Sequence, residues 1–294
     1  MGRKPLLTGL LIFLAVGIFL FLSVYLATFM VERGSLGDER IALVRIEGII
    51  LDSKETLEEI THYNENPSIK AIVLRIDSPG GAVVPSQEIY DEVKRIRAES
   101  KKKVVVSMGT VAASGGYYIA SASDRIVANP GTLTGSIGVI MELANVAGLL
   151  EKIGVESIVV KSGTHKDIGS PFRRMGTEER EILQNVLDDV HNQFIEAVSE
   201  ARGLEIGRVR RLADGRIFTG RQAMELGLVD NLGGLQDTIR MTAEMVGIKG
   251  KPRIVETRKR FSILELLRNR WLGSLAQSFN QSRGTISLQY LLAF

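Results

Sequence analysis

The sequence predicts an α/β fold with mostly parallel strands, preceded by a single membrane-spanning helix. Two patterns support this prediction. Short runs rich in β-branched residues alternate with segments of helical periodicity from residue 41 to residue 246, and a charge-free apolar run lies near the N-terminus. The chain has 294 residues, of which 45% are hydrophobic and 24% charged. A sizeable core is therefore expected, and global disorder is excluded.

The N-terminal apolar run extends from residue 5 to residue 31 without a charged side chain. About 20 apolar residues cross a bilayer, whereas the apolar part of a cleaved signal peptide has only about 7–15. We therefore expect an uncleaved signal anchor rather than a cleaved peptide or a buried core helix. Arg3 and Lys4 precede the run and charges of both signs follow it, which predicts a cytoplasmic N-terminus and an extracytoplasmic remainder.

Five segments of the remaining chain have strand character, because β-branched residues dominate them and turn residues flank them. They are residues 41–46, 71–76, 103–107, 124–128 and 155–160. Helices fill the intervals. The expected helices cover residues 56–63, 86–98, a long segment from Thr177 to Gly203, a short segment through Leu226 that Gly227 caps, and residues 234–246.

The long helix has the most complete pattern. Thr177 is its expected N-cap, and the glutamates that follow suit the positive end of the helix dipole. Its apolar face consists of Ile182, Val186, Val190, Phe194 and Val198.

Four segments follow from these boundaries: a cytoplasmic N-terminus with its anchor (1–31), a tether (32–40), an α/β domain (41–250) and a tail (251–294). Apolar residues recur with amphipathic spacing in the tail, which predicts a helix that lies on the membrane or packs on a neighbouring subunit.

Composition excludes several kinds of site. The chain has no cysteine, so disulfides, thiolate nucleophiles and cysteine-bound zinc are ruled out. It has three histidines, too few for a His-rich metal centre, and we expect no metal and no cofactor. The net charge of +3 arises from mixed charges, which gives no reason to expect a nucleic-acid partner.

Residues 109–119 (GTVAASGGYYI) form the most unusual local sequence. They follow an expected strand, and a helix of small and apolar residues is expected from Ser114 onward. A serine at such a junction lies beside unpaired backbone N–H groups that favour developing negative charge. Taken alone, the pattern also fits Ser114 as an ordinary helix cap next to glycines that allow close packing.

Residues 77–81 (DSPGG) also end a strand, and two successive glycines there can turn an N–H group toward a crevice, as an oxyanion hole requires. A plain tight turn is the alternative. The base for a serine nucleophile is His165 or its neighbour Lys166. A lysine can accept a proton only when it is neutral, which burial in an apolar site favours. An isolated lysine is otherwise a solvated surface charge.

Four ordered motifs resemble those of the short-form bacterial signal peptide peptidases (the SppA type) of serine peptidase family S49. They are residues 75–81 (RIDSPGG), 112–118 (AASGGYY), 134–138 (TGSIG) and 161–167 (KSGTHKD), and residues 220–230 (GRQAMELGLVD) fit as well. The similarity covers roughly residues 40–246 and includes the preceding anchor.

The resemblance implies a repeated ββα superhelical core related to crotonases and the Clp protease. It also implies a Ser/Lys dyad in which Ser114 is the nucleophile, Lys166 the general base and Ser136 the residue that orients the lysine. The backbone N–H groups of Gly81 and Gly115 would form the oxyanion hole, and His165 would be a bystander. Family members assemble as homo-oligomeric rings in which neighbouring subunits complete the sites.

The expected function is that of a membrane-anchored serine endopeptidase of the bacterial inner membrane. Its expected substrates are hydrophobic peptides such as remnant signal peptides. The alternatives are an S49 peptidase that cleaves a membrane-protein partner and a catalytically silent scaffold of the same fold. An acyl-CoA enzyme is disfavoured by the anchor.

Overall fold

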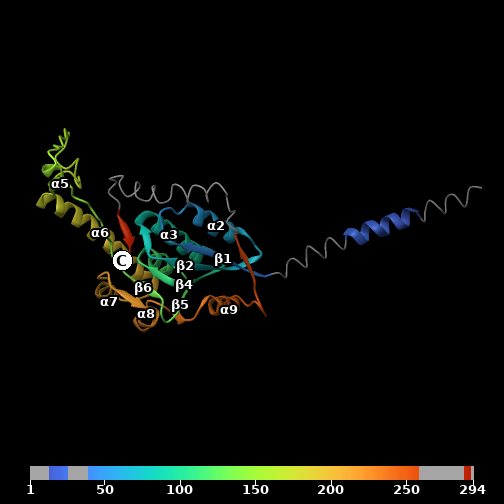
Figure 1. Ribbon diagram of the computed structural model, residues 1–294. Coiled ribbons are helices and arrows are strands. Elements are labelled where there is room, and N and C mark those ends of the chain that lie inside the picture. The colour runs from blue at the N-terminus through green and yellow to red at the C-terminus, as the bar shows by residue number, and fades with distance from the viewer. Residues whose placement is uncertain (1–12, 26–38, 258–287, 293–294) are drawn as a thin grey trace, which may run out of the picture.

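The computed structural model describes residues 13–25, 39–257 and 288–292 (Figure 1). Its main sheet has the strand order β7-β6-β4-β2-β1-β9, and β5 and β8 extend from β4 as a branch. Most strand pairs are parallel, so the α/β prediction is confirmed. The strands are β1 (Arg40–Glu47), β2 (Ile69–Ser78), β3 (Gly80–Ala82), β4 (Lys103–Ala113), β5 (Arg125–Ala128), β6 (Leu133–Gly135), β7 (Ile217–Thr219), β8 (Asn231–Leu232), β9 (Arg253–Glu256) and β10 (Gln289–Leu291).

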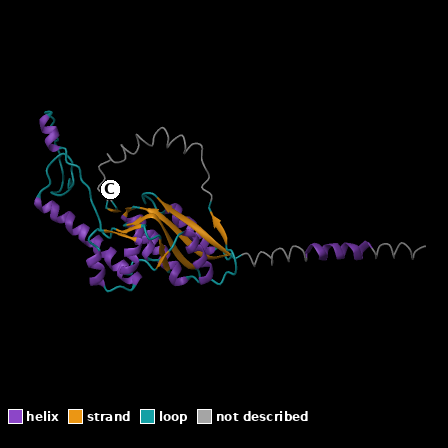
Figure 2. Cartoon of the chain, turned by 60° about the horizontal axis from the view of Figure 1, so that its bottom comes forward, coloured by secondary structure: helices purple, strands orange, loops and turns teal. Residues whose placement is uncertain are grey.

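Helices cover both faces of the sheet, because alternate side chains of each strand point to opposite faces. Val44 packs into the larger core with α2, α3 and α4, whereas Leu43 packs into a smaller core with Ile239 of α9. Figure 2 shows these helices along the sheet. The helices are α2 (Lys54–Glu65), α3 (Val83–Glu99), α4 (Gly115–Ser121), α5 (Ala147–Lys152), α6 (Thr177–Arg202), α7 (Ile206–Leu212), α8 (Gly220–Leu226) and α9 (Leu235–Met245).

Strand β4 contains an irregularity that determines where its end lies. It pairs with β2 in regular register as far as Met108, and pairing then resumes at Ala112. The carboxylate of Asp77 spans this bulge by accepting the Val111 N–H at 3.1 Å. A Cβ on Gly109 would fall 2.5 Å from Cγ of Asp77, so the bulge requires glycine there. The first part of β4 thereby pairs with β5 and its last part with β6.

The prediction of a strand at residues 155–160 is wrong. Ile158 and Val160 are 80% and 95% exposed, and residues 156–160 form no backbone hydrogen bond within the described chain. A β-branched run becomes a strand only beside an edge that offers free N–H and C=O groups. Within the described residues, no such edge meets the segment. Residues 141–176, called the arm below, stand apart from the sheet (Figures 1 and 2).

Helix α6 joins the arm to the body. Its N-cap is Gly176, not Thr177 as predicted, because the Gly176 N–H donates to the Glu179 carboxylate at 3.0 Å and fixes the first turn one residue earlier. Gly203 ends the helix in the left-handed conformation, as predicted.

The predicted apolar face of α6 is buried only in part. Val190, Phe194 and Val198 lie in the core, whereas Ile182 and Val186 are 36% and 41% exposed. The first half of the helix extends with the arm beyond the reach of the sheet. The described chain therefore leaves an apolar face uncovered.

The N-terminal apolar run is described over residues 13–25, which form a helix with every residue exposed. Among the helices in the described ranges, none has the length and apolarity to cross a bilayer. Residues 5–12 and 26–31 of the predicted anchor, most of the tether and residues 258–287 of the tail lie outside the described residues.

Candidate active site

Ser114 lies where β4 ends and α4 begins. Its backbone has φ 51° and ψ −115°, a combination that residues with a side chain rarely adopt. It makes no side-chain capping bond, so it is not an ordinary helix cap. The residue is fully buried, and no described group hydrogen-bonds to its Oγ. An unpaired buried hydroxyl is costly, which favours a chemical role for this group over a stabilising one.

Ser136 lies directly beside Ser114. Strands β4 and β6 pair in parallel at Ala113 and Gly135, so the two serines follow the last paired residues of neighbouring strands. The Ser114 N–H donates to the Gly135 carbonyl at 2.8 Å. Ser136 has φ 49°, and these serines are the two non-glycine residues with positive φ in the described chain. The same edge of the sheet thus holds two strained serines.

Gly81 and Gly115 pack too closely to their neighbours to carry side chains. A Cβ on Gly81 would fall 2.0 Å from the Ile50 carbonyl oxygen, and one on Gly115 would fall 2.6 Å from Oγ of Ser86. The Gly115 Cβ position is also 3.3 Å from the Gly81 nitrogen. The two predicted oxyanion donors therefore adjoin each other next to Ser114. An oxygen between two such N–H groups can carry the negative charge of a tetrahedral intermediate.

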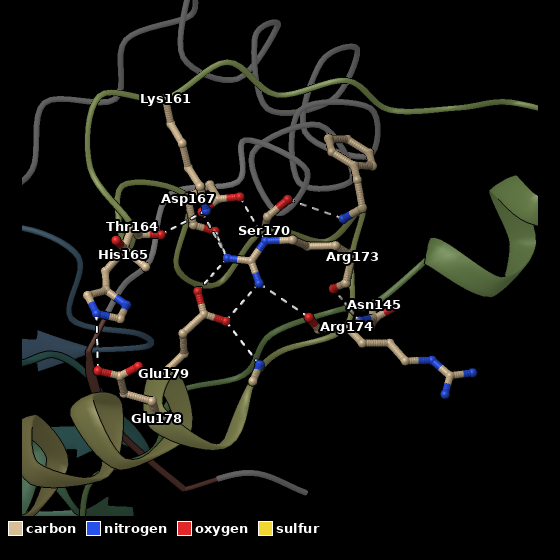
Figure 3. Close-up of polar contacts among 12 residues, drawn as sticks. Asn145, Lys161, Thr164, His165, Asp167, Ser170, Arg173, Arg174, Glu178 and Glu179 are labelled. Atoms are coloured by element: carbon tan, nitrogen blue, oxygen red, sulfur yellow. Dashed lines mark hydrogen bonds and ion pairs between the residues drawn. The ribbon is translucent and has the colours of Figure 1, made fainter.

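Lys166 lies on the arm and is exposed. Its loop is shaped by the neighbouring residue, because the Asp167 carboxylate accepts hydrogen bonds from Arg173 at 2.7 and 2.9 Å and from Lys161 (Figure 3). Arg173 also donates to the Glu179 carboxylate in the first turn of α6, at 2.7 Å. These ion pairs hold residues 161–167, called the lysine loop below, against the first turn of α6.

The structure brings four of the five predicted site residues together but leaves Lys166 apart from them. Neither Lys166 nor His165 hydrogen-bonds to Ser114 within the described chain. The His165 Nε2 atom lies 3.5 Å from a Glu178 oxygen, and its Nδ1 atom is buried without a partner. The described residues contain no cluster of three or more His, Asp or Glu side chains placed to hold a metal ion.

The arm network predicts a response to acid. Hydrogen bonds from Arg173, and next from the Gly176 N–H, lower the pKa of Glu179 from its ordinary 4.5 to about 2, and those from Arg173 and Lys161 lower the pKa of Asp167. Because the folded pKa lies below the unfolded one, the ionised network stabilises the loop fully above pH 4.5 and loses this effect as the pH falls toward 2.

Hydrogen exchange, corrected for the intrinsic effect of pH, should therefore show a loss of protection in residues 161–170 relative to β4 between pH 5 and pH 2. A Glu179→Gln variant should start with lower protection at pH 5 and change less. Equal protection of this loop at both pH values in the unmodified chain would contradict the proposed role of the network.

Several residues that shape the site were not assigned these roles from sequence. Asp77 fixes the bulge of β4, and Thr134 Oγ1 donates to the carbonyl of Ala112, two residues before Ser114, at 2.6 Å. Arg173 holds the lysine loop. Asp77 and Thr134 lie inside motifs that resemble the family's, and this position was the sequence signal for their importance. Arg173 lies outside those motifs, so no sequence signal marked it.

Residues 220–230 connect α6 to strand β5. The Asp230 carboxylate accepts the Ile126 N–H of β5 at 2.7 Å and pairs with Arg202 at the end of α6, also at 2.7 Å. A Cβ on Gly220 would fall 2.1 Å from the Asn129 carbonyl oxygen. This motif therefore has a structural role, joining α6 to the branch of the sheet.

Comparison with known proteins agrees with this architecture. Residues 96–249, more than half of the chain, match peptidase family S49, and residues 34–132 match the Clp protease family.

Individual relatives extend the match. "Putative protease slr0021" of Synechocystis is 46% identical over 211 residues, which cover 71% of this chain and 76% of that protein. "Putative signal peptide peptidase SppA" of Enterococcus faecium is 36% identical, with 71% of this chain and 64% of that protein covered. "Protease 4" of Salmonella typhi is 38% identical, with 71% and 35% covered. The chain therefore belongs to peptidase family S49 and is a serine peptidase with a Clp protease-like α/β domain.

Proposed function

We propose that the chain is a serine endopeptidase with a Ser/Lys dyad. Ser114 Oγ attacks the carbonyl carbon of a peptide bond while the neutral amine of Lys166 takes the hydroxyl proton and then gives it to the leaving amine. Water next attacks the acyl-enzyme with the same lysine as base and releases the carboxylate product. Ser136 orients the lysine, and the N–H groups of Gly81 and Gly115 bind the oxyanion, each contributing roughly 2.7–4 kcal/mol.

The unpaired Oγ of Ser114 is the observation that carries this proposal. It is buried, held on a strained backbone and flanked by the glycine pair that can bind an oxyanion. A hydroxyl with only a packing role would be expected to find a partner. For Ser114, we propose that the missing hydrogen-bond partner is the base that takes its hydroxyl proton.

We propose further that the base comes from a second copy of this chain. Lys166 is exposed on an arm that stands apart from the sheet, and the arm presents apolar side chains to solvent, with Ile158 80% and Phe172 50% exposed. The exposed half of the α6 face continues this surface. Docking of the arm on a neighbour would cover these side chains and desolvate the ammonium, which favours its neutral form.

The proposed location is the bacterial inner membrane, with residues 1–31 as a single-pass anchor, residues 32–40 as its tether and residues 41–250 as an extracytoplasmic catalytic domain. The charge-free run of residues 5–31 and the preceding Arg3 and Lys4 support this arrangement. Hydrophobic peptides near the bilayer, such as remnant signal peptides, are the proposed substrates.

Covalent labelling tests the nucleophile. A fluorophosphonate probe should label the assembled protein at Ser114, as located by mass spectrometry of the labelled peptide. Ser114→Ala should lose the label completely, whereas Ser107→Ala, at another buried serine on β4, should keep it. Absence of labelling in folded, assembled protein would contradict the peptidase mechanism and favour a silent scaffold.

A further inference from the structure

The amino ends of the central strands carry basic side chains along one edge of the main sheet. Strands β4, β2, β1 and β9 lie side by side and run in the same direction (Figure 1). Because neighbouring strands are about 4.8 Å apart, their first residues form a row roughly 15 Å long. The basic edge, as this row is called below, consists of Arg40, Lys70, Lys103 and Arg253 at the strand starts, with Lys101, Lys249 and Lys251 just before β4 and β9.

Three lysines of the basic edge have no use within the described fold. Lys101, Lys249 and Lys251 are exposed, and their side chains form no hydrogen bond or ion pair with the described residues. Lys102 differs from them, since its ammonium donates to three carbonyl groups at the end of α2. The charge of Lys102 therefore stabilises the fold, whereas the other three lysines present their charge to the surroundings.

Acidic side chains do not neutralise the basic edge. Asp124 pairs with Lys103 at 2.8 Å, and Glu39 pairs with Lys70 at 3.8 Å. Two exposed carboxylates remain nearby, one in the last turn of α2 and one in the last turn of α9. The three unpartnered lysines outnumber these two carboxylates. The edge thus keeps a net positive charge, which suits an anionic partner.

The chain that leads to the basic edge indicates which partner this is. The proposed anchor ends at residue 31 and β1 begins at Arg40, so eight residues join them. Eight residues span at most roughly 30 Å when fully extended. The start of β1 therefore cannot lie farther than this from the end of the anchor. A basic surface so close to a bilayer is attracted by anionic lipid headgroups, and each lysine or arginine adds to the attraction.

We propose that the basic edge docks on the anionic headgroups of the bilayer that holds the anchor. This inference rests on the proposed anchor and adds an orientation to it. Strand β4 has 11 residues and rises about 3.3 Å per residue, so Ser114 at its far end lies roughly 35 Å from the basic edge. Docking holds the candidate site at about this height, where it acts on peptides that have left the membrane or extend well out of it.

Energy transfer to labelled lipids tests this orientation in the full chain. The chain has no cysteine, so one introduced cysteine takes a single donor dye. Ala98→Cys and Val84→Cys place the dye at exposed positions at the two ends of α3, roughly 21 Å apart, with Ala98 beside the basic edge. The chain is reconstituted in acceptor-labelled vesicles of phosphatidylcholine, alone or in equal mixture with phosphatidylglycerol. In the mixed vesicles the Ala98 dye should transfer more strongly than the Val84 dye, and high salt should remove the difference.

Removal of charge separates attraction by the lipid from tethering by the anchor. The test variant replaces the three unpartnered lysines: Lys101→Gln, Lys249→Gln and Lys251→Gln. In mixed vesicles it should lower the ratio of docked to undocked domains at least roughly tenfold. The matched control removes three exposed charges elsewhere and should keep the original ratio: Lys54→Gln, Lys152→Gln and Arg221→Gln.

Two results would overturn the inference while leaving the proposed anchor intact. They are equal transfer from the two dye positions in the mixed vesicles, and equal transfer from the Ala98 dye with and without phosphatidylglycerol. Extraction of the chain from the vesicles by alkaline carbonate would refute the proposed anchor itself, and the docking inference with it.

Discussion

Lys166→Ala is expected to reduce peptide hydrolysis by about 10⁴-fold or more, because the serine hydroxyl loses the only group proposed to take its proton. The fold should be retained. Lys166 is exposed in the described chain, and replacement of an exposed side chain usually changes the free energy of unfolding by less than about 0.5 kcal/mol. Steady-state hydrolysis of a fluorogenic apolar peptide, with thermal unfolding as the check on folding, measures both effects.

Two companion variants separate the chemistry from the charge. Lys166→Arg keeps a cation but places a group there that stays protonated, so it should be as inactive as the alanine variant. Lys152→Ala removes an exposed lysine from α5 on the same arm and should keep nearly full activity. Substantial turnover by either Lys166 variant would show that another group is the base.

The strands and helices of the sheet were predictable because their signals are local. Residues 41–46 and 71–76 combine β-branched residues with flanking turns, and their partners lie within the same chain. The α6 stop at Gly203 likewise depends only on neighbouring residues. A local sequence pattern of this kind predicts a strand or helix correctly when the same chain also supplies the neighbouring strand or core on which it packs.

The predictions that failed concern segments whose packing partner is not among the described residues or lies far away in the sequence. Residues 155–160 have the composition of a strand, but the described part of the chain offers them no sheet edge to pair with. Ile182 and Val186 have helical spacing, but no described core residues cover them fully. A single sequence does not reveal whether such a surface is covered by its own chain or by another. β10 illustrates the converse, since its three residues carry no strand pattern and pair with glycines far upstream.

For the site itself, the motifs indicated Ser114, Ser136 and the glycines, and the structure places these residues side by side. The contribution of Lys166 could not be located from sequence, because residue spacing says nothing about which copy of the chain supplies a side chain. The positive φ of both serines was equally invisible in the sequence; both residues directly follow the last paired positions of β4 and β6.

The most direct test of a dyad that joins Ser114 of one subunit to Lys166 of another is the activity of mixed assemblies. Ser114→Ala and Lys166→Ala chains, each inactive alone, would be co-expressed with different affinity tags, and assemblies that carry both tags would be purified. If neighbouring subunits complete the sites, random mixing at equal amounts restores both side chains in about a quarter of the sites, with hydrolysis in proportion. Mixed assemblies as inactive as either parent, with subunit exchange verified by the tags, would contradict a site shared between copies.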